Sequence, residues 1–326
     1  MNSEIKMRKT GFVSLIGPSN SGKSTLVNAL VGKKISIVTP KEQTTRQRIL
    51  GIKTDKESQI AYIDTPGFFG GNYRGEMSSY LQSETSEGAK GVDVVLYCID
   101  SSEIVRGGES ATKRVLLPLK EKFSVKINSF DIDFIVLNKI DLVEKSALLP
   151  AIDQLDKELA IIKENIKHIF LPVSARTGDG LSNLREEIIS RLTPGPELFP
   201  EDMITEQTDE FFASEIIREK AFLCLKQELP YGIGVLVRSW EDNSKYCLIQ
   251  GDLIVEKDSH KGIILGKGGS MIERIGTLAR QELERLYGVK IVLKLFVRIE
   301  KDWTRSKGGL MKAGYLTDIS RSDSVI

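Results

Sequence analysis

The chain has 326 residues, a length that favours two domains over one. Of these residues 40% are hydrophobic and 28% charged, as in an ordinary soluble protein. Lys and Arg number 46 and Asp and Glu 45, and this net charge of +1 argues against a uniformly basic nucleic-acid binder. The three cysteines are scattered among apolar residues, which favours reduced thiols over disulfides or a zinc site. No apolar run approaches the roughly 18 residues of a membrane span, and residues 1–11 lack the apolar core of a signal peptide, so we expect a cytoplasmic protein.

Residues 11–192 alternate short β-branched runs with helical periodicity, which predicts a doubly wound, mostly parallel α/β sheet with helices on both faces. The predicted strands are Phe12–Ile16, Ile60–Asp64, Val92–Asp100, Phe134–Asn138 and His168–Val173. Polar or glycine residues end these strands at their C-terminal sides, where open α/β sheets bind ligands. The proline-rich run Thr193–Pro200 fits neither a helix nor a central strand. We therefore predict a first domain over residues 1–192 and a linker over 193–208.

Residues 209–326 are predicted to form an α+β domain with the element order α-β-β-α-α-β. The predicted elements are a helix Asp209–Leu229 capped by Thr208 or Asp209, strands Gly232–Trp240 and Tyr246–Glu256, an apolar turn Gly262–Leu265, a helix Ser270–Tyr287 and a strand Val289–Ile299. A glycine loop, Gly266–Gly269, precedes the second long helix.

The segment GPSNSGKS, Gly17–Ser24, fits the phosphate-loop pattern G-x-x-x-x-G-K-[ST] and follows the first predicted strand. A glycine-rich turn that opens a helix points free backbone N–H groups at one spot, where the helix dipole favours an anion. Lys23 is expected to reach the terminal phosphates of a nucleotide, and Ser24 to give its hydroxyl to Mg²⁺. The alternative is a tight turn that merely carries Lys and Ser. The residues predicted to contact the phosphates are Gly17, Pro18, Ser19, Asn20, Ser21, Gly22, Lys23, Ser24 and Thr25.

Two further motifs follow predicted strands. Asp64 in the sequence DTPG would hold Mg²⁺ through water, and the Gly67 N–H would bond the γ-phosphate, although such a cluster by itself is usually a plain turn. In the sequence NKID, Asp141 can accept from both the ring N–H and the exocyclic amine of guanine, a pattern that adenine lacks. Asn138, Lys139 and Asp141 are therefore predicted to select guanine. The residues Ser174, Ala175 and Arg176 would add a backbone N–H towards the guanine carbonyl.

Taken in order, these motifs resemble the Era family of P-loop GTPases, in which a GTPase domain precedes an RNA-binding KH domain with this type II order. The resemblance covers nearly the whole chain. It rests on GPSNSGKST, QTTR at switch I, DTPG, NKID and SARTGDG, and in the second domain on REK, ELPY and GKGG. It implies hydrolysis of GTP to GDP and phosphate, with Lys23, Thr45, Gly67 and Asn20 as catalytic residues. Either Thr45 or its neighbour Thr44 would close over Mg²⁺, and both could equally be β-branched loop residues.

Phe68 follows the DTPG glycine, where Ras-type GTPases place a water-orienting glutamine. Phe68 can neither donate nor accept a hydrogen bond, so the attacking water must be positioned otherwise. The resemblance implies that Asn20 helps to hold K⁺, whose charge would replace an arginine finger. The alternative is that Asn20 is a turn residue. We hypothesise a slow intrinsic GTPase that K⁺ stimulates.

The second domain carries its charge unevenly. Residues 261–312 hold 12 Lys and Arg against 5 Asp and Glu, a net charge of +7, whereas residues 201–260 hold 6 against 13, a net charge of −7. A single basic region is typical of phosphate-backbone binding, and a solvated charged face is the alternative. The GKGG loop opens a helix, so its N–H groups can approach a nucleic-acid backbone. The predicted RNA contacts are Ile264, Gly266, Lys267, Gly268, Gly269 and Arg274, with Ile263 and Leu265 completing an apolar floor for bases.

The resemblance further implies that the RNA is the 3′ end of small-subunit ribosomal RNA and that the protein assists assembly of the small ribosomal subunit. It also implies peripheral contact with the cytoplasmic face of the membrane, to which nothing in these residues points, and we expect a monomer. One rival hypothesis is an RNA-binding assembly scaffold that holds but barely hydrolyses guanine nucleotide, and Phe68 keeps it open. Another is a metabolic P-loop kinase or ATPase, against which the NKID motif argues.

Overall fold

The computed structural model describes residues 7–68, 73, 75–123, 132–162, 169–243 and 245–316. These residues form two compact units. The first extends to residue 206, and the second begins at residue 207 and also includes Tyr73 and residues 75–81. Most of the predicted linker therefore groups with the first unit.

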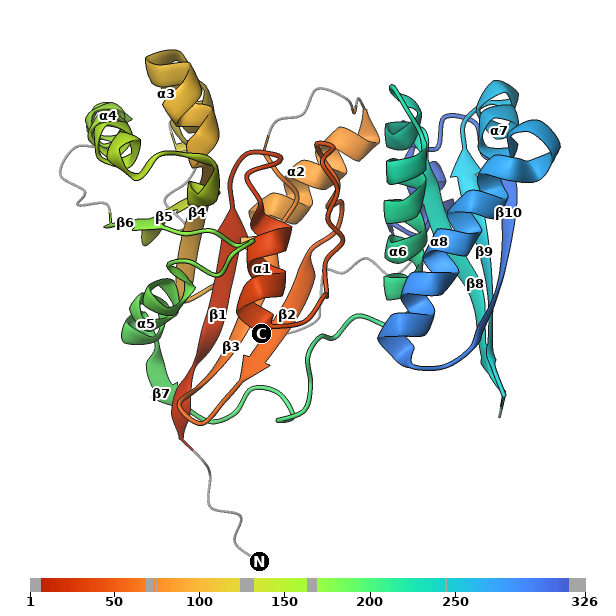
Figure 1. Ribbon diagram of the computed structural model, residues 1–326, viewed down its shortest axis with the longest axis horizontal. Helices are drawn as coiled ribbons and strands as arrows, with labels where there is room; N and C mark the ends of the chain where they lie inside the picture. Colours follow the sequence, from red (N-terminus) through yellow and green to blue (C-terminus); the bar gives the residue numbers. More distant parts are fainter. Residues whose placement is uncertain are drawn as a thin grey trace, which may run out of the picture. The chain divides into compact units, whose positions relative to one another are not determined.

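The first unit is built on a sheet whose seven described strands follow the order β2-β3-β1-β4-β5-β6, with β7 paired to β1 (Figure 1). The strands are β1 (Arg8–Ile16), β2 (Ile49–Thr54), β3 (Ser58–Asp64), β4 (Val94–Asp100), β5 (Phe134–Asn138), β6 (Ile169–Pro172) and β7 (Thr193–Gly195). Only β2 and β7 run antiparallel to their neighbours among these pairings. Every residue of β4 and β5 except Asp100 is buried, because elements cover both faces of the sheet. The predicted doubly wound sheet is confirmed.

Five helices lie between these strands along the described part of the chain. They are α1 (Lys23–Val31), α2 (Glu76–Gly88), α3 (Ser101–Phe123), α4 (Leu148–Ile162) and α5 (Leu181–Arg191), with 3₁₀ turns at Ile140–Leu142 and Lys145–Ala147. Tyr97, Leu137 and Leu155 belong to one buried cluster that joins β4, β5, α3 and α4. The parallel connections bring the C-terminal ends of β1, β3, β4 and β5 to one edge of the sheet. His168, the predicted start of β6, lies outside the described residues.

The strand β7 corrects the prediction for the linker. It pairs antiparallel with Arg8–Thr10 at the start of β1, and a strand at this outer position tolerates Pro194 because no ladder depends on its missing N–H. The buried Arg8 guanidinium then lies 3.1 Å from a carboxylate oxygen of Glu197 and 2.6 Å from one of Glu201. Residues 193–201 are therefore attached to the first sheet.

The second unit contains a three-stranded sheet in the order β10-β9-β8, with α6 and α8 lying together over one face (Figure 1). Its elements are α6 (Asp209–Cys224), a 3₁₀ turn (Leu229–Gly232), β8 (Gly234–Asp242), β9 (Cys247–Val255), α7 (Asp258–Leu265), a 3₁₀ turn (Lys267–Gly269), α8 (Ser270–Tyr287), β10 (Ile291–Ile299) and α9 (Lys307–Lys312). β8 and β9 are antiparallel, whereas β9 and β10 are parallel. This is the predicted KH order.

Local chemistry sets the helix ends of the second unit. The Thr208 side chain accepts a hydrogen bond from the Phe211 N–H at 3.2 Å and caps α6, as predicted. α6 ends at Cys224 rather than at Leu229, because Leu225 is already extended. The predicted apolar turn at 262–265 is instead the second half of α7. None of the helices within the described ranges is long and apolar enough to cross a membrane.

Candidate nucleotide site and nucleic-acid interface

Two glycines set the path of the loop between β1 and α1. Gly17 has φ 142°, and a Cβ there would lie 2.3 Å from the Cys98 carbonyl oxygen. Gly22 has φ 92°, and its Cβ would lie 2.3 Å from Asn138 Nδ2. Both positions therefore exclude any side chain, and the loop lies directly against β4 and the end of β5.

Backbone hydrogen bonds join this loop to the DTPG turn. The Ser19 N–H donates to the Phe68 carbonyl at 3.1 Å, and the Phe68 N–H donates to the Gly17 carbonyl at 3.0 Å. A Cβ on Gly67 would lie 2.5 Å from Ser19 Cα, so the two segments touch. The Ser19 amide is therefore not among the free N–H groups predicted for an anion, because it completes this bridge.

Lys23 is 5% exposed and sits inside the loop. Its Nζ donates to the carbonyls of Gly17 at 3.0 Å and Pro18 at 2.8 Å. Burial lowers the pKa of the Lys23 ammonium, and the nearby Asp64 carboxylate acts in the opposite direction. A buried ammonium on a loop shaped by glycines is suited to receive phosphate oxygens.

Three oxygen-bearing side chains converge beside Lys23. Ser24 Oγ lies 2.8 Å from Thr45 Oγ1, which donates to Asp64 Oδ2 at 3.4 Å. Asp64 is fully buried, and burial raises the pKa of its carboxyl, while the Ser24 hydroxyl and Lys23 oppose this rise. Its Oδ1 has no hydrogen-bond partner among the described residues. Two hydroxyls and a carboxylate with an unsatisfied oxygen fit Mg²⁺, which takes hard oxygen ligands.

Their hydrogen-bond partners also distinguish the two threonines that could close over Mg²⁺. Thr44 Oγ1 bonds Thr39 Oγ1 at 2.6 Å and the Lys41 carbonyl at 2.8 Å, away from Asp64. Thr45 instead faces Ser24 and Asp64. The geometry therefore favours Thr45 as the metal-closing residue.

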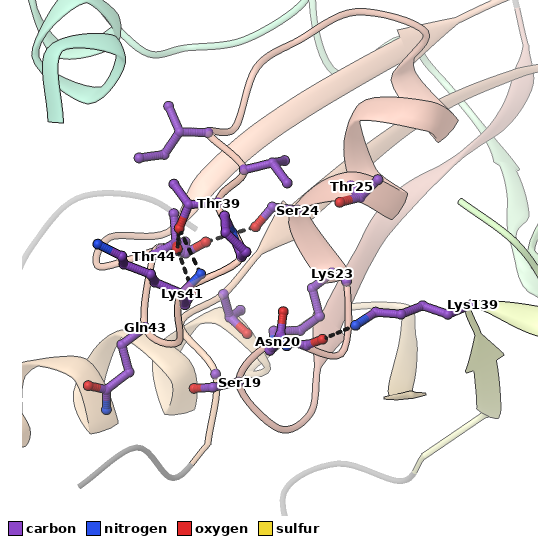
Figure 2. A pocket seen from close by; sticks show the side chains of 17 residues that line it. Ser19, Asn20, Lys23, Ser24, Thr25, Thr39, Lys41, Gln43, Thr44 and Lys139 are labelled. Carbon is purple, nitrogen blue, oxygen red and sulfur yellow. Dashed lines mark hydrogen bonds between the residues drawn. The ribbon is translucent and has the colours of Figure 1, made fainter. Parts of the chain in front are cut away.

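A cavity of about 300 Å³ lies over these groups, between the phosphate loop and the segment that precedes β2 (Figure 2). The labelled side chains around it are Ser19, Asn20, Lys23, Ser24, Thr25, Thr39, Lys41, Gln43, Thr44 and Lys139. Thr65 and Gly67 from the DTPG turn also line it. The cavity thus brings together the phosphate loop, the QTTR segment and the DTPG turn, and Lys139 adds the NKID motif.

The predicted guanine residues gather at the ends of β5 and β6. Asn138 Nδ2 donates to the Ser21 carbonyl at 2.9 Å, which ties β5 to the phosphate loop. Ser174 Oγ donates to Asp141 Oδ1 at 2.6 Å, and Arg176 forms an ion pair with Asp141 Oδ2. The Ser174 hydrogen bond and the Arg176 charge lower the pKa of the Asp141 carboxyl. Asp141 is thus held ionised, as an acceptor for guanine donors requires.

The Ala175 N–H has a different hydrogen-bond partner from the one predicted. It donates to Asn138 Oδ1 at 3.1 Å, because the Asn138 amide bridges the ends of β5 and β6. In this arrangement the amide predicted for the guanine carbonyl is directed at a side chain of the same site.

The K⁺ hypothesis concerns Phe68 and Asn20. The Phe68 side chain packs against the cluster of β4, β5, α3 and α4, so it contributes no polar group to the cavity. Asn20 is exposed and has φ 63°, and its carbonyl accepts a hydrogen bond from Lys139 Nζ at 2.6 Å. Its side chain makes no hydrogen bond within the described part of the chain and lines the cavity.

The GKGG loop is an open structure at the start of α8. Gly266 has φ 70°, and a Cβ there would lie 2.8 Å from Met271 Cβ. Gly268 and Gly269 have φ 62° and 85°, and their Cβ positions face open space. Lys267 and Arg274 are exposed beside them. The loop backbone is accessible to a bulky anion.

The prediction for Ile264 is wrong. Ile264 is fully buried, whereas its neighbour Ile263 is 54% exposed, because α7 turns residue 264 towards the core. Trp303 is also fully buried, donates Nε1–H to the Gly232 carbonyl at 3.1 Å and stacks on Tyr315. Trp303 is therefore part of the packed core of this unit.

Sequence reasoning missed Asp100. This residue ends β4, and its Oδ2 accepts a hydrogen bond from Lys139 Nζ at 2.7 Å. A carboxylate at the C-terminal end of a predicted strand was the available signal. We find no cluster of three His, Cys, Asp or Glu suited to a metal within the residues that the structure describes.

Known proteins resemble both units. Residues 12–139 match a family described as a 50S ribosome-binding GTPase, and residues 228–304 match the KH domain. GTPase Era of Syntrophus aciditrophicus is 38% identical over 311 residues, which cover 95% of this chain and 96% of that protein. The chain belongs to the Era family of GTPases. Era of Thermotoga maritima is 39% identical over 296 residues, or 90% of this chain and 93% of that protein.

Two solved Era structures are similar over 95% of this chain and 100% of theirs. One is Era in complex with MgGDPNP and nucleotides 1506–1542 of 16S ribosomal RNA, at a TM-score of 0.84 and 33% identity. The other is Era from Aquifex aeolicus, a variant bound to GDP and AlF4−, at a TM-score of 0.80 and 34% identity. The predicted Era family, fold class and GTPase activity are confirmed.

Proposed function

We propose that this Era-family GTPase binds the 3′ end of small-subunit ribosomal RNA through its KH domain and uses GTP hydrolysis to time its release during subunit assembly. The GKGG loop carries this proposal, because it presents accessible backbone next to Lys267 and Arg274 in a region of net charge +7. A related Era binds 16S RNA nucleotides together with MgGDPNP, which supports the same ligands here.

The reaction transfers the γ-phosphoryl group of GTP to water. The water oxygen forms a bond to phosphorus as the bond to the β–γ bridging oxygen breaks, and the water proton leaves with the phosphate products. Lys23 and the Gly67 N–H stabilise the charge on the phosphate oxygens, and Asp141 holds the guanine. Ser24, Thr45 and Asp64 would hold Mg²⁺, which when bound neutralises charge on the β- and γ-phosphates.

Potassium is a second part of the proposal. Asn20 lines the phosphate cavity, and Phe68 leaves the position after Gly67 without a polar side chain. K⁺ held in part by Asn20 would supply the missing positive charge. We expect faster GTP turnover in KCl than in NaCl, and loss of that difference in Asn20→Ala. Equal turnover in both salts by wild type and Asn20→Ala would exclude this role.

An RNA-binding scaffold that holds but barely hydrolyses guanine nucleotide is the competing function. A single-turnover assay with the full chain separates the two, because a switch converts bound GTP to GDP on the assay timescale. Intact GTP after prolonged incubation in KCl and MgCl2, with or without RNA, would favour the scaffold.

Binding of the wild-type chain to a short RNA with the 3′ terminal sequence of small-subunit ribosomal RNA tests the RNA assignment. We expect at least tenfold tighter binding than to a scrambled RNA of the same length at matched salt. Equal affinity for both RNAs would contradict the assignment.

The proposal places the protein in the cytoplasm as a monomer that acts on the small ribosomal subunit. Its contact with the membrane is peripheral, at the cytoplasmic face. Flotation of the full chain with anionic vesicles tests this contact, and recovery of the protein only in the soluble fraction would remove it.

A further inference from the structure

Asp100 connects the nucleotide motifs although it belongs to none of them. Its carboxylate is 12% exposed and accepts a hydrogen bond from Lys139 Nζ through Oδ2 at 2.7 Å. Its Oδ1 accepts from the Ser102 N–H at 2.9 Å and the Ser102 hydroxyl at 2.7 Å, at the start of α3. Asp100 is also the register partner of Asn138, so it lies beside the guanine motif on the adjacent strand. One oxygen of Asp100 therefore fixes α3, and the other fixes Lys139.

Lys139 spans two loops. The same ammonium that bonds Asp100 also donates to the Asn20 carbonyl at 2.6 Å, which Figure 2 shows as a dashed line from Lys139. Asn20 and Lys139 both have left-handed backbones, with φ 63° and 64°. Non-glycine residues adopt this conformation when surrounding contacts hold them there. The contact between Lys139 and Asn20 therefore joins two left-handed turns, of which the one at Asn20 is the less strained because Asn tolerates this conformation.

A lysine ammonium sits on a flexible four-carbon stem, so its direction depends on its partners. The Asn20 carbonyl is neutral, whereas the Asp100 carboxylate is charged and largely shielded from water. A charge-assisted hydrogen bond is about twice as strong as a neutral one. Asp100 is therefore the contact that decides where the Lys139 ammonium points.

We propose that Asp100 is a positioning residue of the nucleotide site. It holds the Lys139 ammonium against the Asn20 carbonyl, so that the guanine motif and the phosphate loop keep one fixed spacing. A guanine nucleotide must contact both segments at once, and a site with fixed spacing binds it with a smaller ordering cost. This inference rests on the nucleotide site described above and adds a residue that acts on it through Lys139.

Asp100→Asn is the most selective variant. Its amide oxygen can still accept from the Ser102 N–H and keep the start of α3, while the negative charge that faces Lys139 is removed. Asp93→Asn is the matched control, because the Asp93 carboxylate accepts the Phe12 N–H at 2.8 Å just before the start of β4. The length of β4 separates the control from Lys139, about 20 Å at 3.3 Å per residue.

Titration of the full chain with fluorescent GDP measures the effect. We expect GDP to bind about tenfold more weakly to Asp100→Asn, and Asp93→Asn to stay within about twofold of wild type. Asp100→Glu keeps the charge and should recover part of the loss. The thermal midpoint without nucleotide should be unchanged in Asp100→Asn, which separates positioning from folding.

A double-mutant cycle with Lys139→Gln decides the route of the effect. If Asp100 acts through Lys139, the double variant binds GDP as weakly as Lys139→Gln alone. Fully additive losses would overturn the inference, as would wild-type GDP affinity in both Asp100→Asn and Asp100→Glu. Absence of GDP binding by the wild-type chain would instead overturn the nucleotide site itself, so the two failures are distinguishable.

Discussion

Two glycine loops open helices in this chain, and they are built in opposite ways. In the loop before α1, Lys23 is buried and bonded to loop carbonyls, and side chains at Gly17 and Gly22 would clash with their surroundings. In the loop before α8, Lys267 is exposed and Gly268 faces open space. Similar sequence chemistry therefore makes an enclosed site for a small ligand in one unit and an open surface for a polymer in the other. Ligand binding at the loop before α1 should depend on individual contacts, and binding at the loop before α8 should depend on charge.

Loss of the guanine carboxylate should give the largest effect on the enclosed site. We expect Asp141→Asn to weaken GDP binding about a hundredfold, because an amide offers one acceptor where guanine presents two donors. Xanthosine diphosphate, whose ring has a carbonyl in place of the amine, should bind the variant better than wild type. Competition titration measures both, with the exposed Asp153→Asn on α4 as control. Unchanged GDP affinity in Asp141→Asn would contradict the guanine assignment.

A pair of glycine substitutions tests directly whether the two loops are built differently. Gly22→Ala should weaken GDP binding at least tenfold, since its Cβ would lie 2.3 Å from Asn138 Nδ2. Gly268→Ala should cost about 1 kcal/mol of stability from backbone strain alone and leave GDP binding unchanged. Chemical denaturation and GDP titration on both variants check this. A similar loss of GDP affinity in both would show that the two loops are not built differently.

The open loop should respond to salt. We expect Lys267→Ala to weaken RNA binding about three- to tenfold at low salt and to reduce the slope of log affinity against log salt by about 1. Lys226→Ala, an exposed lysine in the acidic half of the unit, is the matched control and should change neither. Equal effects of the two substitutions would contradict a localised RNA surface.

The smallest effect concerns pH. The Ser174 hydrogen bond and Arg176 lower the pKa of Asp141 below its ordinary 3.8. A depressed pKa keeps the carboxylate ionised above it, so guanine binding is lost only as pH falls through that lowered value. Arg176→Ala should move this loss to higher pH, with little change at pH 7. GDP titration from pH 7 down to 3, a range that spans the ordinary pKa of 3.8, measures the shift. Superimposable profiles for Arg176→Ala and wild type would contradict it.

The nucleotide motifs were predictable because each follows a strand, and parallel strands place their C-terminal ends at one edge. Contacts between residues far apart in the sequence could not be predicted. The bond between the Ser19 amide and Phe68, and the pairing of β7 with β1, join residues whose proximity no local pattern encodes. Ile263 and Ile264 are chemically alike, and only the phase of α7 decides which is buried. Asp100 was not predicted because its partner, Lys139, follows the neighbouring strand β5 and is distant in the sequence.

We propose that the nucleotide bound to the first unit controls the affinity of the second unit for RNA. The most direct measurement is the affinity of the full chain for the 3′-terminal small-subunit RNA, with a non-hydrolysable GTP analogue and with GDP, both with Mg²⁺. We predict at least about fivefold tighter RNA binding with the analogue, the lower range of typical coupling between two sites. Equal RNA affinity in the two nucleotide states, by protein that binds both nucleotides, would contradict the account.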